Sequence, residues 1–299
     1  MAAITASTVN ELRQKTNAGM MDCKKALTEA AGDMEAAIDI LRKKGIASSA
    51  KRADREAKEG TVQAVLNAGS TAGALVEVNC ETDFVGKNEN FRSFVDLVAR
   101  HIVDAGPADG DLAGALSQPV PASAGLKLEE VIKEKGGIVG ENIVLRRFRR
   151  FAAPANGAIA SYIHLGGKVG VLLEATATKP ETIASETFKS LLRDINLHIA
   201  ASSPVSVGRD SVDPEVVAKE RAIYADSDRL KGKPAAAMEG ILNGMIGKFY
   251  SQICLLEQGF VKDPDKTIAQ LVDETGKALG DTITITRFTR FALGEELKA

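Results

Sequence analysis

The sequence predicts an α+β protein in which a small N-terminal module of three helices precedes a duplicated core of antiparallel sheet plus helix. The main evidence comes from aligning the sequence with itself. At an offset of 97 residues, 60–62 align with 157–159 and 73–77 with 170–174. At an offset of 140, six of the twelve residues in 140–151 are identical to those in 280–291. In each copy the alternating segments precede an amphipathic stretch, so helices should cover one side of each sheet.

Composition agrees with a globular protein of about two domains, at about 150 residues per domain. The chain has 299 residues, of which 44% are hydrophobic and 26% charged, and its net charge is −2. That charge gives no general attraction to nucleic acid or to an anionic membrane. The three cysteines are odd in number and far apart, which argues against a disulfide framework and suits a reducing compartment. We therefore expect a soluble, cytoplasmic protein with no membrane partner and no direct nucleic-acid partner.

Residues 1–45 predict the helical module. Val9 and Leu12 sit at helical spacing, and the pattern resumes after a break at residues 17–19. Asp33 is a suitable N-cap for a third helix, and Gly45 stands where a C-terminal cap is expected. Residues 46–59 are rich in alanine and charge and predict a linker.

Residues 60–153 form the first predicted unit and residues 154–299 the second. In the first, alternating residues predict a hairpin over 62–78, and residues 143–151 predict a closing strand. The helix between them has one apolar face, formed by Phe91, Phe94, Val95, Val98 and Ile102.

The second unit carries 43 extra residues, because the offset rises from 97 to 140 between its helix and its last strand. They predict a helical hairpin over about 212–257. Asp213 and Pro214 are typical of a helix start, and residues 232–234 predict the turn. Two antiparallel helices joined by a short turn should form a projecting arm. Its apolar positions are Val216, Ile223 and Leu230 on the first helix and Met238, Ile241, Leu242, Met245, Phe249, Ile253 and Leu256 on the second.

Residues 82–87 are the best functional candidate, because the second unit has an unrelated sequence, 179–184, at the same place. We expect them in a loop between strand and helix. One interpretation is structural, with Asp83 capping the helix and Phe84 buried. The other is a wedge, in which the ring enters an apolar pocket of a partner while the carboxylate perturbs a cation site.

Catalytic patterns are largely missing. Each Gly-Lys pair fails the phosphate-loop pattern, because no serine or threonine follows the lysine. His101 and His198 fall at equivalent positions, which favours a packing or capping role. His164, near the tip of the second hairpin, is equally compatible with an exposed turn and with a partner contact. We expect no enzyme activity, no cofactor and no metal site.

The arginine- and phenylalanine-rich strand 146–151 is compatible with an RNA-binding surface, which is the alternative function. However, Arg147, Phe148, Arg150 and Phe151 recur in the second unit, so a structural role is favoured. Arg146 and Arg149 are left unexplained by that reasoning.

Five segments, residues 9–27, 77–85, 161–170, 198–204 and 255–264, together resemble the translation elongation factor Ts family in the same order. The resemblance covers nearly the whole chain. It implies a ubiquitin-associated-like fold for the N-terminal module and a coiled-coil arm for the inserted hairpin. A plain adaptor, whose N-terminal helices dock a ubiquitin-like partner, would explain neither residues 82–85 nor the arm.

The resemblance further implies a guanine-nucleotide exchange factor for the GTPase elongation factor Tu, bound in its GDP-loaded and nucleotide-free forms. Thr82, Asp83, Phe84 and Val85 would enter the nucleotide domain and disturb its Mg²⁺ and phosphate site. Further partner contacts carried over from the family are Arg13, Met20, Met21 and His164.

Three features depart from the family pattern. Gly86 stands where alanine is usual, which predicts a looser loop, and Gly259 replaces a proline. The sequence also ends at Ala299, soon after the last predicted strand, whereas some members continue into another helix.

Overall fold

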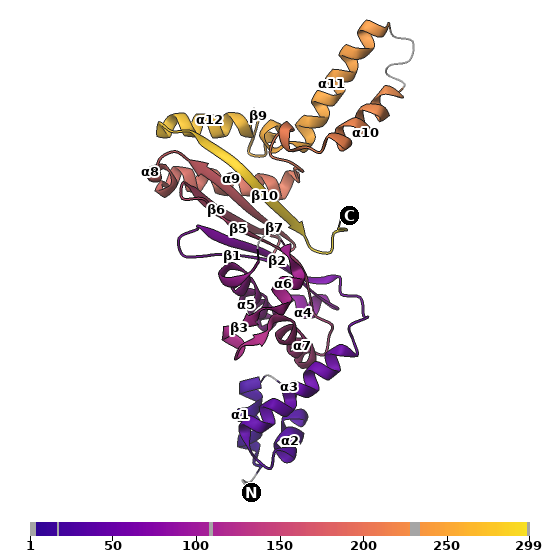
Figure 1. The fold of residues 1–299 in the computed structure, drawn as a ribbon, viewed down its shortest axis with the longest axis vertical. Helices are drawn as coiled ribbons and strands as arrows, with labels where there is room; N and C mark the ends of the chain where they lie inside the picture. The colour runs from indigo at the N-terminus through magenta and orange to yellow at the C-terminus, as the bar shows by residue number, and fades with distance from the viewer. Residues whose placement is uncertain (1–3, 17, 108–109, 228–233, 298–299) are drawn as a thin grey trace.

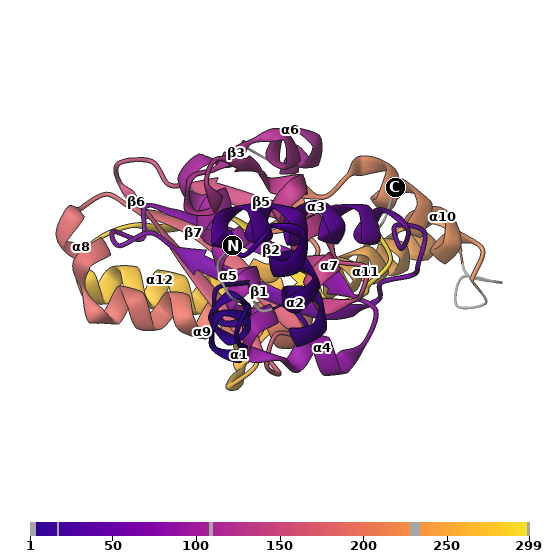
Figure 2. The same ribbon diagram turned by 90° about the horizontal axis from the view of Figure 1, so that it is seen from below.

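The computed structural model describes residues 4–16, 18–107, 110–227 and 234–297. It is an elongated α+β molecule with three helices at one end, two sheets in the middle and a helical arm at the other end (Figure 1). Seen from below, the N-terminal helices lie in front of the sheets, and the arm points to one side (Figure 2). In the described residues no helix is long and apolar enough to span a membrane.

The N-terminal module consists of α1 (Ala6–Thr16), α2 (Met20–Glu29) and α3 (Met34–Ala50). The predicted cap is confirmed, because Asp33 accepts a hydrogen bond of 2.9 Å from the amide of Ala36. Asn17, in the predicted break, lies outside the described residues. The module has a small core of its own, made of Val9, Leu12, Ala18, Cys23, Ala26, Leu27 and Ala37.

Gly45 does not end the third helix, so that prediction was wrong. α3 continues through Gly45 to Ala50, where it crosses α7 (Leu128–Val139). A Cβ added to Gly137 of α7 would lie 2.3 Å from the Cα of Gly45. The pattern typical of a cap therefore marks a close helix crossing, at which a side chain on Gly137 would push the module away from the core, whereas a Cβ on Gly45 would make an ordinary contact of 3.7 Å.

Two three-stranded antiparallel sheets form the centre of the molecule. One has the order β1-β2-β5 and the other β10-β7-β6. Their bounds are β1 (Glu59–Leu66), β2 (Ala72–Cys80), β5 (Val144–Ala152), β6 (Gly157–His164), β7 (Val169–Ala177) and β10 (Ile283–Ala292).

The sheets pack face to face, and the helices cover their outer faces (Figure 1). α5 (Glu89–Ala105) and α7 share a core with the first sheet, whereas α9 (Glu186–Ser202) and α12 (Ile268–Leu279) share one with the second. The predicted apolar face of the helix over residues 91–102 is buried in α5. His101 and His198 are also buried, in agreement with a packing role.

Matching backbone hydrogen bonds join the two halves of the core. The amide of Val62 donates to the carbonyl of Gly167, and the amide of Ile159 donates to that of Ser70, both over 2.7 Å. Each residue of one pair stands 97 positions from its counterpart in the other. The hairpin turn of each sheet is therefore fastened to the first strand of the other.

A second recurrent piece escaped the sequence analysis. A two-stranded ribbon precedes the last helix of each half: β3 (Pro119–Val120) with β4 (Leu126–Lys127), and β8 (Gly259–Phe260) with β9 (Asp263–Thr267). β3, β4 and β8 have two residues each, too few for a periodic signal, and β9 is five polar or proline residues with no apolar alternation. Gly259 permits a tight ribbon, because a Cβ there would lie 2.8 Å from the carbonyl oxygen of Pro264.

The inserted residues form a projecting hairpin of α10 (Pro214–Ala225) and α11 (Ala235–Ile253) (Figure 1). Asp213 caps α10 as predicted, since it accepts a 2.9 Å hydrogen bond from the amide of Glu215. Leu230 and residues 232–233 of the predicted turn lie outside the described residues. The other short elements are α4 (Asp83–Lys87), α6 (Leu112–Ser117), α8 (Pro180–Ala184), η2 (Pro121–Ser123), η3 (Arg209–Ser211) and η4 (Leu255–Glu257).

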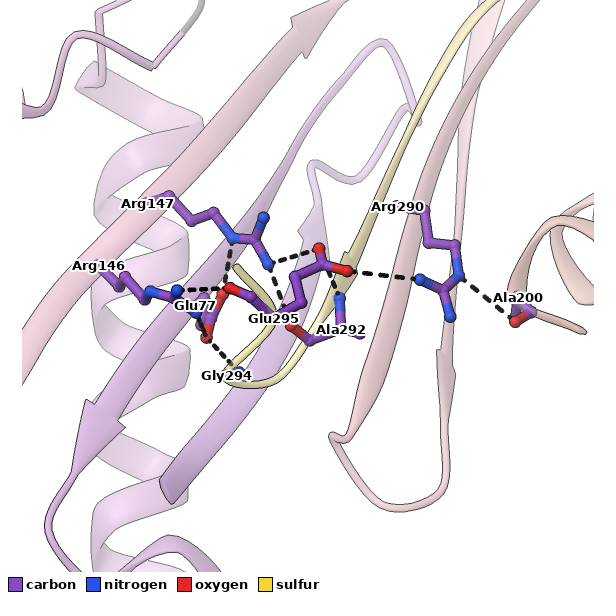
Figure 3. A network of polar contacts seen from close by, with 8 residues as sticks. All are labelled: Glu77, Arg146, Arg147, Ala200, Arg290, Ala292, Gly294 and Glu295. Carbon is purple, nitrogen blue, oxygen red and sulfur yellow. Dashed lines mark hydrogen bonds and ion pairs between the residues drawn. The ribbon is translucent and has the colours of Figure 1, made fainter. Parts of the chain in front are cut away.

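A buried carboxylate joins β2, β5 and the C-terminal segment (Figure 3). The side chain of Glu77 is 0% exposed. It accepts hydrogen bonds from Arg146 (2.9 Å), Arg147 (2.6 Å) and the amide of Gly294 (2.8 Å). Arg147 also donates to Glu295 over 2.7 Å. Arg146, which the repeat left unexplained, thus has a structural partner.

The arginine and phenylalanine side chains of β5 and β10 interlock across the two sheets. The guanidinium of Arg147 lies 4.0 Å from the ring centroid of Phe291, and that of Arg287 lies 4.2 Å from that of Phe151. Arg287 also pairs over 2.8 Å with buried Glu174, the counterpart of Glu77. The structural interpretation of these recurring residues is confirmed, because the rings of Phe148, Phe151 and Phe291 are buried and therefore cannot stack with bases.

We predict that Glu77→Gln destabilises the protein by about 3 kcal/mol, because it leaves Arg146 and Arg147 without their buried counter-charge. Urea unfolding followed by circular dichroism measures the effect as a lower midpoint. Glu56→Gln is the control, because Glu56 is exposed and its pairing with Lys58 should contribute little. A Glu77→Gln midpoint equal to that of the parent would contradict the role given to this carboxylate.

Candidate partner-binding site

The candidate segment is a single helical turn rather than the irregular loop that we expected. β2 ends at Cys80, and α4 (Asp83–Lys87) follows it directly. Thr82 caps this turn by accepting a 3.4 Å hydrogen bond from the amide of Val85. Threonine is a favoured cap because its hydroxyl satisfies an otherwise unpaired amide at a helix start. The capping role proposed for Asp83 therefore belongs to Thr82.

A carboxylate from the neighbouring strand end holds the backbone before α4. Glu141 accepts hydrogen bonds from the amides of Glu81 (2.9 Å) and Thr82 (3.0 Å) and from the Thr82 hydroxyl (2.5 Å). In the other half, Asp281 accepts from the amides of Thr178 (3.1 Å) and Lys179 (3.0 Å), ahead of α8 (Pro180–Ala184). Both halves thus use the same clamp, and the difference between them lies in the side chains that follow.

Three residues anchor α4 from beneath. Val85 is half-buried against the first core, and Cys80 donates to the carbonyl of Thr82 over 3.2 Å. Burial, followed by the negative charge of Glu141, raises the pKa of the Cys80 thiol to about 12. Gly86 is buried, and a Cβ there would lie 2.9 Å from the carbonyl oxygen of Gly60. The thiol thus stays protonated at neutral pH, and the glycine lets the turn seat closely against β1.

The Phe84 side chain projects from this anchored turn. It is 84% exposed, the highest value for a large apolar side chain in the described residues. Asp83 pairs with Lys87 over 2.7 Å, and its hydrogen bond with Lys87 lowers the pKa of Asp83. The interpretation of a buried phenylalanine is therefore wrong. An exposed ring beside an ionised carboxylate is what the wedge interpretation requires.

The turn between β6 and β7 lies next to α4. His164 is half-buried, and its Nδ1 lies 3.0 Å from the hydroxyl of Tyr162. The next residue, Leu165, is 68% exposed. A cavity of about 270 Å³ is lined by Asp83 and Lys87 on one side and by Leu165 and residues 166–168 on the other. The structure thus brings the turn that follows His164 against the segment that carries Asp83 and Phe84.

Leu165 is a candidate that the sequence reasoning missed. Its signal was an apolar residue directly before two glycines at a hairpin tip, where a buried position is not expected. Such a residue contributes nothing to the core and remains available to a partner.

The other predicted contacts lie apart from α4, on the N-terminal module. Arg13 of α1 is exposed, and Met20 and Met21 of α2 are 52% and 63% exposed. These helices occupy the lower end of the molecule in Figure 1, whereas α4 belongs to the core. The candidate residues therefore form two separate surfaces, both with exposed apolar side chains.

Comparisons with known proteins agree with the resemblance. Residues 81–295 match the family model described as "Elongation factor TS". The chain is 48% identical over 296 residues to "Elongation factor Ts" of Trichlorobacter lovleyi, covering 99% of this chain and 94% of that protein. It is 49% identical over 295 residues to the protein of that name from Syntrophotalea carbinolica, with the same coverage. The protein of that name from Nitratiruptor is 44% identical over 296 residues, covering 99% of this chain and 95% of its own.

We predict that Glu141→Ala speeds amide hydrogen exchange in residues 82–87 by about tenfold or more, because α4 loses the hydrogen bonds that hold its start, from the amides of Glu81 and Thr82 and from the Thr82 hydroxyl. Hydrogen exchange followed by mass spectrometry measures this segment directly. Asp281→Ala is the matched control, since it should speed exchange in residues 179–184 and leave 82–87 unchanged. Equal protection of residues 82–87 in Glu141→Ala and parent would show that the clamp does not hold α4.

Proposed function

The chain belongs to the elongation factor Ts family, and we propose that its α4 turn drives guanine-nucleotide exchange on elongation factor Tu. As a family member it is a nucleotide exchange factor in translation elongation, which acts by binding and is not an enzyme. The proposal concerns the means of exchange. Phe84 and Asp83 would enter the partner's nucleotide domain and disturb the Mg²⁺ and phosphate site there.

The observation that carries the proposal is that the backbone at the start of α4 is held firmly while the ring of Phe84 is exposed to solvent. Glu141 and Thr82 fix the start of α4, whereas Phe84 is 84% exposed. A rigid aromatic side chain gains affinity by burial in a pocket, and it loses little conformational entropy because its backbone is already ordered. Leaving such a ring in water favours a surface that is covered on binding.

The mechanism follows from the role of the metal in the partner. In GTPases Mg²⁺ bridges and neutralises the phosphates and holds the switch segments. An inserted ring that shifts the elements around the metal, together with the Asp83 carboxylate, would weaken Mg²⁺ binding and hence GDP binding. By linkage, the factor that lowers GDP affinity is itself bound less tightly when GDP is present. The factor would therefore bind the nucleotide-free form most tightly and leave when new nucleotide enters.

The remaining family contacts belong to the same proposal. Arg13, Met20 and Met21 would form a second contact with the nucleotide domain, on a module that resembles a ubiquitin-associated fold. His164 would touch a different domain of the partner. The α10–α11 hairpin corresponds to the family's coiled-coil arm. In this proposal the chain acts in the cytoplasm, where translation elongation takes place, and does not bind nucleic acid directly.

We predict that the Asp83→Ala/Phe84→Ala double variant lowers the rate of catalysed GDP release about tenfold to hundredfold. A buried aromatic anchor is worth about 2 kcal/mol or more, and each 1.4 kcal/mol changes a rate tenfold. The measurement is stopped-flow release of a fluorescent GDP analogue from elongation factor Tu at millimolar Mg²⁺. Val205→Ala is the control, because Val205 is a 63% exposed apolar residue outside the proposed contacts.

Each outcome has a distinct meaning. Strong acceleration by the parent and by Val205→Ala, with most of it lost in the double variant, supports the wedge. Equal acceleration by parent and double variant keeps the exchange function but moves its cause to the other contacts. Repeating the series at low Mg²⁺ tests the metal step, since the defect should shrink when the metal is already absent.

A further inference from the structure

A single arginine joins the α4 turn to the turn between β6 and β7. Arg92, near the start of α5, donates from Nε to the carbonyl of Gly86 over 3.4 Å. Its Nη2 donates to the carbonyl of Gly166 over 3.2 Å. One carbonyl belongs to α4 and the other to a hairpin of the opposite sheet, 80 residues further along the chain. The guanidinium therefore bridges the two segments that line the cavity beside Asp83.

Among the residues that the structure describes, the other half of the core has no equivalent bridge. The residue 97 positions after Arg92 is Lys189, and it pairs over 2.8 Å with Glu186 on its own helix. The backbone bonds between turns and first strands are nevertheless matched in the two halves. In this respect the two halves therefore differ only locally. The arginine bridge occurs beside α4, which carries the exposed Phe84, and has no counterpart in the described residues beside α8.

The turn between β6 and β7 is held in place by β1, so the carbonyl of Gly166 has a fixed position as the acceptor for Arg92. Gly166 and Gly167 have φ values of +64° and +100°, which glycine adopts without strain. The carbonyl of Gly167 is taken by the amide of Val62, and a Cβ on Gly167 would lie 2.0 Å from the hydroxyl oxygen of Thr61. One end of the turn is thus fixed to β1. The bond from Arg92 to Gly166 fixes the adjoining peptide, directly after exposed Leu165.

We propose that Arg92 is a positioning residue that sets the separation between Phe84 and the His164–Leu165 tip, so that both meet the partner together. This inference rests on the proposed exchange function. A guanidinium suits the task, because its donors point in fixed directions and can hold two carbonyls at once, whereas a lysine ammonium is a point charge on a flexible stem. If the two contact surfaces are already held in their bound arrangement, less conformational entropy is lost when the partner binds.

The test measures GDP release as a function of factor concentration for the parent, Arg92→Ala, Arg92→Lys and Phe84→Ala. We expect Arg92→Ala to lower the maximal rate about threefold to tenfold, as loss of one part-buried and one exposed hydrogen bond allows. The half-saturating concentration should change less than about twofold, because either surface alone still supports the encounter. Arg92→Lys should resemble Arg92→Ala, because charge without the fork does not rebuild the bridge.

Arg100→Ala is the matched control, since Arg100 lies on the same helix and pairs over 2.7 Å with Asp96, away from the bridge. It should behave as the parent does. Hydrogen exchange of the free proteins gives a second readout: Arg92→Ala should speed exchange in both residues 83–87 and 165–168, and Arg100→Ala in neither.

The possible outcomes distinguish a failure of this inference from a failure of the proposed exchange function. If the parent accelerates release, Phe84→Ala does not, and Arg92→Ala equals the parent, then the inference fails and the proposed function stands. A raised half-saturating concentration with an unchanged maximal rate would mean that the substitution weakens binding or reduces the amount of folded factor without affecting release in the complex, and it too would overturn the inference. If the parent fails to accelerate release, both proposals fail.

Discussion

The buried carboxylate of Glu77 requires a counter-charge and hydrogen-bond donors, and these come from separate parts of the core. A charge removed from water must be balanced and hydrogen-bonded nearby. Arg146 and Arg147 of β5 and the amide of Gly294 meet this condition, so β2, β5 and the C-terminal segment converge on one point (Figure 3). Arg147 then lies over the ring of Phe291 in the other sheet. Because these contacts fix the two sheets relative to each other, the β1–β2 and β6–β7 hairpin turns, each of which contacts the opposite sheet, keep a fixed separation.

The duplication shows how a new surface is made without a new backbone. Glu141 and Asp281 clamp equivalent strand ends, and α4 and α8 are short turns at the same place in the two halves. The structure therefore tolerated a change of side chains at α4 with little cost to the fold. An exposed aromatic ring contributes almost nothing to folding stability, so its presence there is better explained by binding than by packing.

The repeat allowed most of the fold to be predicted, because glycines, buried glutamates and arginine–phenylalanine pairs recur only where two segments pack alike. The errors have physical causes. Gly45 was interpreted as a cap because glycine is common both at helix ends and at close helix crossings such as the one with Gly137, and sequence alone does not distinguish the two. The ribbons before α7 and α12 are too short or too polar to show a period. The position of residues 82–87 between a strand and a helix was predicted, but their helical turn, the exposure of Leu165 and the Arg92 bridge depend on contacts between residues distant in the chain.

Gly86 illustrates why the rigidity of α4 cannot be judged from composition. Glycine at this position predicts a looser segment, because it widens the conformational choice of the unfolded chain. In the structure the same residue brings α4 within contact of Gly60, where a methyl group would lie 2.9 Å from a carbonyl oxygen. The carbonyl of Gly86 in turn accepts from Arg92. Glycine at position 86 therefore has two opposite effects. It raises the entropy lost on folding, but it also lets α4 pack closely on β1 and accept a hydrogen bond from Arg92, which reaches the opposite sheet. For the proposed wedge the second effect matters more, because contacts of Gly86 with β1 and Arg92 hold the whole turn in place, whereas the conformational freedom of one residue affects α4 only locally.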